Sequence, residues 1–167
     1  MLFLQKLQQI YHGEGNGISL PLLLIDVNLD GTEDIVVTLF NSTIITFNGL
    51  TFKEMWNYTI PNTEVISVPI PGYYNDDKIP DLMVKHQYGP GFPVYYYTTT
   101  TILDGKSGKP LLNSPMEDTM SGQMSGLSLT VNDFGNDWFL HWSADCLNFE
   151  KSREKYDFIF SIYTDFN

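Results

Sequence analysis

Residues 26–37 read Asp-Val-Asn-Leu-Asp-Gly-Thr-Glu-Asp-Ile-Val-Val, and the predicted fold depends on this stretch. Four oxygen-bearing side chains fall at loop positions 1, 3, 5 and 9, namely Asp26, Asn28, Asp30 and Asp34. Calcium takes about six to eight oxygen ligands, and a tightly turning loop can present alternate side chains to it with a backbone carbonyl between them. The spacing therefore predicts a Ca2+ loop in which the carbonyl of Thr32 is a fifth donor. The alternative is an Asx-rich turn that joins two strands.

The residues next to the loop indicate strands rather than the helices of an EF-hand. An EF-hand needs a bidentate Glu at position 12, where this chain has Val37. The run Ile35-Val36-Val37 is β-branched and follows the loop directly, which favours a strand. Gly31 suits a turn residue with positive φ, where a Cβ would be costly. The prediction is a strand, a calcium loop and a second strand.

The composition of the 167-residue chain indicates a folded, β-rich protein. Hydrophobic residues make up 43% of it, which argues against disorder, and 10 Tyr and 11 Phe favour sheets. The net charge is −11 with only nine Lys plus Arg, so no basic stripe could neutralise phosphates, and nucleic-acid binding is excluded. The longest apolar stretch, Leu20–Ile25, contains a proline and is too short to span a bilayer.

Two features bear on the cellular location. Asn41-Ser42-Thr43 and Asn57-Tyr58-Thr59 are glycosylation sequons, which favour an extracellular protein with glycans at Asn41 and Asn57. The N-terminal residues lack the basic region and long apolar core of a signal peptide, which taken alone favours the cytosol. Cys146 is the single cysteine, so it is either a buried thiol or one half of a bridge to further sequence.

The calcium loop recurs along the chain. Aligning Asp34 with Asp81 places residues 73–84 on the first loop. The second copy lacks one carboxylate and the turn glycine, because Tyr73 and Lys78 stand at positions 1 and 6. We therefore expect it to bind calcium weakly or not at all. A third, more diverged copy lies at 132–140, with an aspartate, Asp137, over Asp34.

A second element repeats in step with the loops. Residues 44–56 and 100–112 each read as a strand, a tight Asn-Gly or Asp-Gly turn and another strand, which predicts a hairpin. A period of roughly 50 residues with several short strands fits a four-stranded propeller blade. The predicted fold class is all-β, a partial β-propeller of about two complete blades and part of a third. The blade-like units are expected at about 20–68, 69–127 and 128–167.

Two stretches carry a resemblance to known families. The loop at 26–37 resembles the FG-GAP repeat of integrin α-subunit propellers. Residues 86–112 and 133–143, with Cys146, resemble the "family with sequence similarity 234" proteins, members A and B, over about residues 20–147. The resemblance implies the extracellular propeller of a single-pass membrane protein whose transmembrane helix lies upstream of Met1. This chain departs from that pattern by lacking the anchor and most of the ring. The family implies no established biochemical activity.

The expected function is non-enzymatic, as an extracellular recognition or scaffold module with one structural calcium loop and an unknown protein or glycan ligand. The first alternative is a carbohydrate-binding propeller, in which exposed aromatics of the run Tyr88–Tyr97 stack on sugar rings. The second is a propeller enzyme, which the sequence favours least. No histidine has a metal-site spacing and no Gly-x-Ser-x-Gly motif occurs. The three tryptophans are expected to pack between blades: Trp56, Trp138 and Trp142.

Overall fold

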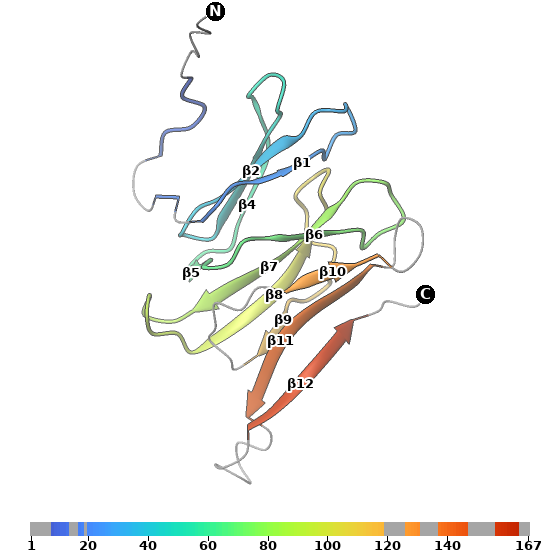
Figure 1. Cartoon of the computed structure of the whole chain (residues 1–167). Helices are drawn as coiled ribbons and strands as arrows, with labels where there is room; N and C mark the ends of the chain where they lie inside the picture. Colours follow the sequence, from blue (N-terminus) through green and yellow to red (C-terminus); the bar gives the residue numbers. More distant parts are fainter. Residues whose placement is uncertain are drawn as a thin grey trace, which may run out of the picture.

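The structure of the protein is a computed structural model that describes residues 8–13, 17–18, 20–118, 126–130, 137–146 and 156–163. Within these residues the chain forms twelve strands and no helix. The strands make three antiparallel sheets that follow one another from the top to the bottom of the view in Figure 1. The all-β prediction is confirmed. The partial propeller stays a prediction.

Sheet 1 is a meander whose four strands pair in chain order: β1 (Leu23–Ile25), β2 (Asp34–Thr38), β3 (Thr43–Phe47) and β4 (Glu54–Thr59). The predicted strand–loop–strand is confirmed, because β1 and β2 flank residues 26–33 and pair from Ile25 and Asp34 outward. The hairpin predicted at 44–56 is also confirmed, since β3 and β4 pair across the turn that contains Gly49.

Sheet 2 repeats this arrangement with a broken first strand. Its strands are β5 (Thr63–Glu64), β6 (Ile70–Gly72), β7 (Asp81–Tyr88), β8 (Tyr97–Leu103) and β9 (Met116–Asp118). Both β5 and β6 pair with β7 on the side away from β8, so together they act as one interrupted edge strand. Sheet 1 has a comparable break, because Ile18 bridges Leu39 upstream of β1. Sheet 2 begins at Thr63, ahead of the unit boundary expected at residue 69.

Sheet 3 has three described strands, in the order β10 (Leu127–Leu129), β11 (Trp138–Cys146) and β12 (Tyr156–Tyr163). It begins close to the third unit boundary expected at residue 128. Its first strand, β10, lies against β6 of sheet 2.

The core consists of three apolar clusters, and the alternation of side chains along each strand explains which cluster a residue joins. Val36 of β2 joins the apolar cluster between sheets 1 and 2, whereas its neighbour Val37 joins a cluster on the other face of sheet 1. Leu82 and Met83 of β7 divide in the same way between the two faces of sheet 2, because successive strand residues point to opposite faces. Burying each such side chain contributes about 1.5–3 kcal/mol. Both faces of β2 and β7 therefore carry buried apolar side chains.

Trp56 of β4 joins sheets 1 and 2. Its indole N–H donates to the carbonyl of Gly105 at 2.9 Å, and its ring belongs to the cluster between the two sheets. Gly108 has φ +70°, and a Cβ there would lie 2.4 Å from the indole ring. A glycine at this position thus lets the ring lie against the turn backbone. Trp56 packs between sheets, as the sequence predicts.

Candidate metal centre

The loop at 26–34 is wound around the side chain of Asp26. Oδ1 of Asp26 accepts the backbone N–H groups of Asn28 at 3.3 Å and Asp30 at 3.2 Å, and Oδ2 accepts the N–H of Gly31 at 2.9 Å. Gly31 has φ +85°, as expected for a turn glycine, and Leu29 also lies in the left-handed region at +59°. The aspartate therefore sets the path of the turn by satisfying three of its backbone donors.

Two further side chains of the loop continue this pattern. Oδ1 of Asn28 accepts the N–H of Asp30 at 2.8 Å, and Oδ1 of Asp30 accepts the N–H of Thr32 at 2.9 Å. The amide of Asn48, from the turn after β3, donates to Oδ2 of Asp30 at 3.2 Å. The hydrogen bond from the Thr32 N–H holds the pKa of Asp30 below its usual value. The exposed carboxylate of Asp30 is therefore ionised at neutral pH.

Asp34 differs from the other loop residues because it is completely buried. Oδ2 accepts the N–H of Val27 at 3.1 Å, and Oδ1 accepts the N–H of Gly49 at 2.9 Å and the amide of Asn28 at 3.3 Å. The side chain predicted as the position-9 ligand thus joins the loop to the hairpin turn between β3 and β4.

The donor set of the first loop suits calcium by ligand type. Asp26, Asn28 and Asp30 offer only oxygen, which a hard cation prefers, and each carboxylate oxygen can accept more than one contact. In the described part of the chain, no three His, Cys, Asp or Glu side chains gather into a preassembled metal group. Any ion held by this loop would therefore also depend on amide and backbone oxygens, including the carbonyl of Thr32. The predicted ligands lie on one turn, but the side-chain oxygens of Asp26, Asn28 and Asp30 already accept hydrogen bonds from the loop backbone.

The second loop keeps part of this hydrogen-bond pattern, because Asp81 and Asp77 bond to the backbone as Asp34 and Asp30 do, whereas Tyr73 has no carboxylate. Oδ2 of Asp81 accepts the N–H groups of Tyr74 at 2.9 Å and Asn75 at 3.1 Å, and Oδ1 accepts the N–H of Gly105 at 3.1 Å. Burial raises the pKa of Asp81 to about 6, against the lowering effect of these three donors. Asp77 accepts the N–H of Ile79 at 2.8 Å, as Asp30 does from Thr32.

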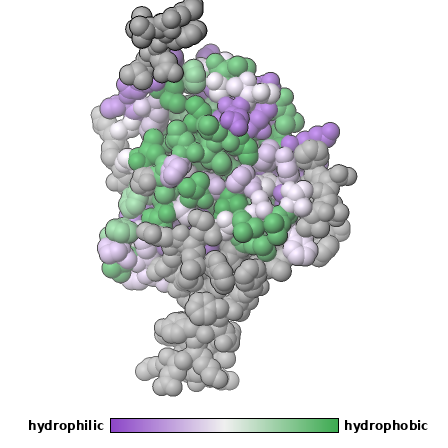
Figure 2. Space-filling model, viewed as in Figure 1, coloured by the Kyte–Doolittle hydropathy of each residue, from purple (hydrophilic) through white to green (hydrophobic). Residues whose placement is uncertain are grey.

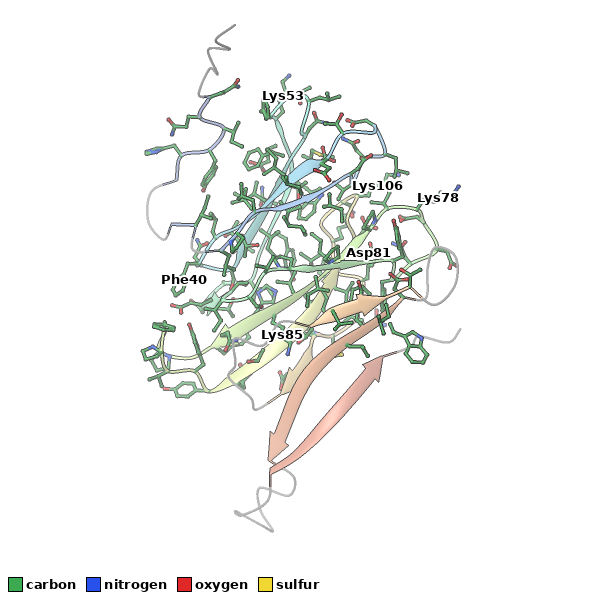
Figure 3. All side chains as sticks on the ribbon, in the orientation of Figure 1. Phe40, Lys53, Lys78, Asp81, Lys85 and Lys106 are labelled. Atoms are coloured by element: carbon green, nitrogen blue, oxygen red, sulfur yellow. The ribbon has the colours of Figure 1, made fainter. Side chains whose placement is uncertain are left out.

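The residues that differ between the two loops disfavour cation binding by the second loop. Lys78 replaces the glycine, and Lys106 lies in the turn beside Gly105; both are exposed, and they lie on the same side of the view as Asp81 (Figure 3). Two positive charges near the loop oppose a divalent ion by Coulomb repulsion. The geometry thus gives a physical reason for the expected weak calcium binding of this copy.

The contact between a buried aspartate and a turn glycine occurs in both sheets, and we call it the Asp–Gly turn contact. It joins Asp34 to Gly49 and Asp81 to Gly105. A Cβ on Gly49 would lie 2.0 Å from a backbone oxygen, and one on Gly105 would lie 1.9 Å from the equivalent oxygen. Sequence reasoning assigned these glycines only to hairpin turns. The signal that could have revealed the contact was the recurrence of an Asn-Gly or Asp-Gly pair after each loop, although the glycine follows the aspartate by 15 residues in sheet 1 and by 24 in sheet 2.

The third copy contributes a contact between sheets. Oδ2 of Asp137 accepts the N–H of Tyr73 at 2.9 Å and the hydroxyl of Thr130 at 3.1 Å, and the Asp137 N–H donates to the Tyr73 carbonyl at 2.9 Å. Oδ1 of this buried side chain has no hydrogen-bond partner among the described residues. The backbone of Tyr73 therefore joins sheets 2 and 3, although its side chain cannot replace the carboxylate that Asp26 provides in the first loop. Residues 132–136 of the third copy lie outside the described residues.

The remaining predicted residues are scattered over the molecule. Asn41 is exposed in the turn between β2 and β3, and Asn57 is exposed on β4, where its amide donates to Oε1 of Glu54 at 2.6 Å. In the Tyr88–Tyr97 run, Tyr96 is 70% exposed, but Tyr95 is half-buried and donates its hydroxyl to Glu64. The side chain of Cys146 lies outside the described residues.

Searches of protein-family models, curated proteins and solved structures found no match to this chain. Among the residues that the structure describes, no helix has the length and apolar character needed to cross a membrane. The interpretation of the loops therefore rests on their own geometry.

Proposed function

We propose that this chain is part of a β-propeller of FG-GAP-like blades, with two complete blades and part of a third, and that it acts as a non-enzymatic recognition or scaffold module. The observation that carries the proposal is the Asp–Gly turn contact, which recurs in sheets 1 and 2 with the same atoms in the same roles. A contact that recurs within consecutive sheets is expected of copies of one structural unit.

The packing of the sheets supports the propeller part of the proposal. Each of the first two sheets is an antiparallel meander, and apolar clusters lie between sheets 1 and 2 and between sheets 2 and 3. Propeller blades pack face to face in this way around a common axis. Apolar residues also gather on the face that carries β1, where Leu22 and Leu24 are 49% and 53% exposed (Figure 2). An exposed apolar face suits contact with another blade or a partner.

The proposed role of Ca2+ is structural. Asp26 and Asp30 carry like charges on one short loop, and a divalent cation between them would offset their repulsion. The same ion would tie the loop to the turn after β3, because Asn48 already bonds to Asp30. Calcium would then stabilise the end of sheet 1 that carries this loop and the turn after β3.

The calcium proposal is tested by thermal melting during a calcium titration, with magnesium as the comparison ion. At 100 times Kd, an ion that binds only the folded state adds about 2.7 kcal/mol, which corresponds to roughly 5–10 °C for a protein of this size. We expect Asp30→Ala to abolish the rise. The matched control is Asp77→Ala in the second loop, which should melt with the same calcium response as the native chain. An unchanged melting temperature in the native chain would refute the calcium site.

The proposed location is the extracellular face of a membrane, as the ectodomain of a single-pass protein. It rests on the family resemblance and on the exposure of both sequon asparagines, Asn41 and Asn57. We expect the chain, secreted from animal cells behind an added leader, to lose mass on treatment with an N-glycosidase. Asn41→Gln and Asn57→Gln should each remove one glycan. A secreted chain with neither glycan would count against this location.

A further inference from the structure

An open pocket of about 470 Å³ lies between the ends of sheets 1 and 2, on the edge where β5 pairs with β7. Sheet 1 contributes Asn41 and Thr59, and sheet 2 and the segment before it contribute Asn62, Glu64 and Gln87. None of the residues that line it belongs to the calcium loops. The pocket is therefore separate from the candidate metal centre.

The lining has a consistent chemistry. It offers two carboxamides, from Asn41 and Asn62, together with threonine hydroxyls and one carboxylate, from Glu64, whereas the carboxamide of the buried Gln87 is bonded to Thr98. A carboxamide both donates and accepts hydrogen bonds, which matches a ligand whose hydroxyls do the same. Among the described residues that line the pocket there is no lysine, arginine or histidine, so an anionic ligand such as a phosphate would meet no positive charge from them.

The wall formed by Glu64 is held in place by the aromatic loop at 89–96. Oε2 of Glu64 accepts the N–H of Phe92 at 3.1 Å and the hydroxyl of Tyr95 at 2.5 Å. Burial, followed by the interaction with Glu64, raises the pKa of Tyr95, so its hydroxyl keeps the proton that it donates. The carboxylate is thus positioned before any ligand arrives.

The same loop carries two exposed aromatic side chains and borders the pocket at Gly89. Gly89 lines the pocket, and a Cβ there would lie 3.1 Å from the backbone nitrogen of Tyr96. Tyr96 is 70% exposed, and Phe92 is 61% exposed. An exposed aromatic ring on the loop that borders the pocket offers an apolar face in addition to the polar contacts of the lining. A sugar ring has the complementary surfaces, an apolar face of C–H groups and a rim of hydroxyls.

We propose that this pocket binds a neutral hexopyranose unit, with the hydroxyls or acetamido group bonded by the carboxamides and Glu64. The sugar has two possible sources. One is a free glycan or a glycan on a partner. The other is the glycan of this chain at Asn41, because the sequon asparagine itself lines the pocket. The second source rests on the proposed extracellular location, whereas the first does not.

The first experiment uses the full chain made in bacteria, which carries no glycan, and follows its amide NMR spectrum during titration with glucose, galactose, mannose and N-acetylglucosamine. We expect shifts at Asn62, Glu64 and Gln87. Asn62→Asp keeps the shape of the side chain but removes its N–H donors, and it should weaken binding by about threefold to tenfold. The matched control is Asn113→Asp, an exposed amide away from the pocket, which should bind as the native chain does.

The second experiment distinguishes the two sources with the secreted, glycosylated chain. If the Asn41 glycan occupies the pocket, its enzymatic removal should lower the melting temperature, and Asn41→Gln should show the same loss, whereas Asn57→Gln should not. Absence of free-sugar binding together with an unchanged melting temperature on removal of the Asn41 glycan would overturn the proposal. Binding of a lysine-rich peptide in place of sugars, lost in Glu64→Gln, would also overturn it. Neither outcome depends on calcium, so failure here leaves the calcium test unaffected.

Discussion

His86 of β7 is completely buried, and neither ring nitrogen has a hydrogen-bond partner among the described residues. It faces sheet 1, where the ring of Tyr58 lies edge-on with centroids 6.5 Å apart. Burial lowers the pKa of His86 from 6.5 to about 3. The folded protein therefore holds a neutral imidazole at a position where the charged form would lose its hydration without a compensating partner.

The sign of the pH effect follows from proton linkage. Between pH 3 and 6.5 the unfolded chain binds a proton at His86 that the folded chain does not, so the free energy of unfolding falls as the pH falls through this window. At pH 5, about 1.5 units below the unfolded pKa, the loss relative to pH 7.5 is about 2 kcal/mol. Small domains have only about 5–15 kcal/mol of total stability, so this loss is measurable.

The assay is urea unfolding at pH 7.5 and pH 5, followed by tryptophan fluorescence. Substitution of His86→Gln gives a side chain that is neutral at both pH values, so the native chain should lose about 2 kcal/mol more than the variant between them. Any contribution from Asp81, whose raised pKa has the opposite effect, is common to both proteins and cancels. His12→Gln changes an exposed histidine and should follow the native chain. Equal pH dependence in the native chain and His86→Gln would refute the reasoning.

Two further predictions test the contacts that organise the sheets. Gly49→Ala and Gly105→Ala each place a Cβ about 2 Å from a backbone oxygen and should each cost more than about 3 kcal/mol in urea unfolding. Gly17→Ala, which meets nothing within 4 Å, should change stability little, and equal effects at all three glycines would contradict the close-approach argument. Trp56→Phe leaves the buried carbonyl of Gly105 without its indole donor and should cost about 1–3 kcal/mol, as measured by thermal or urea unfolding. A neutral Trp56→Phe would show that this bond between sheets 1 and 2 contributes nothing.

Much of the local structure could be predicted from the sequence. The β-branched run after Asp34 became β2, and the Asn-Gly pair at 48–49 became the turn between β3 and β4, because side-chain alternation and turn chemistry act over a few residues. The left-handed conformation of Gly31 was predictable for the same reason. The recurrence of the loop at 73–84 was also visible, and Asp77 and Asp81 repeat the backbone hydrogen bonds of Asp30 and Asp34.

The sequence by itself determined the all-β class, the positions of the turns and the repeat of the aspartate loops. Only the tertiary structure decided that Asp34 bonds to Gly49 and that Asp137 bonds to Tyr73, which lies 64 residues earlier in the chain. It also decided that Tyr95 bonds to Glu64, which lines a pocket. The physical reason is the range of the interactions. A local pattern sets how a strand or turn folds, but contacts between distant residues depend on which strands pair and which faces stack, and burial then selects the polar groups that must find one another.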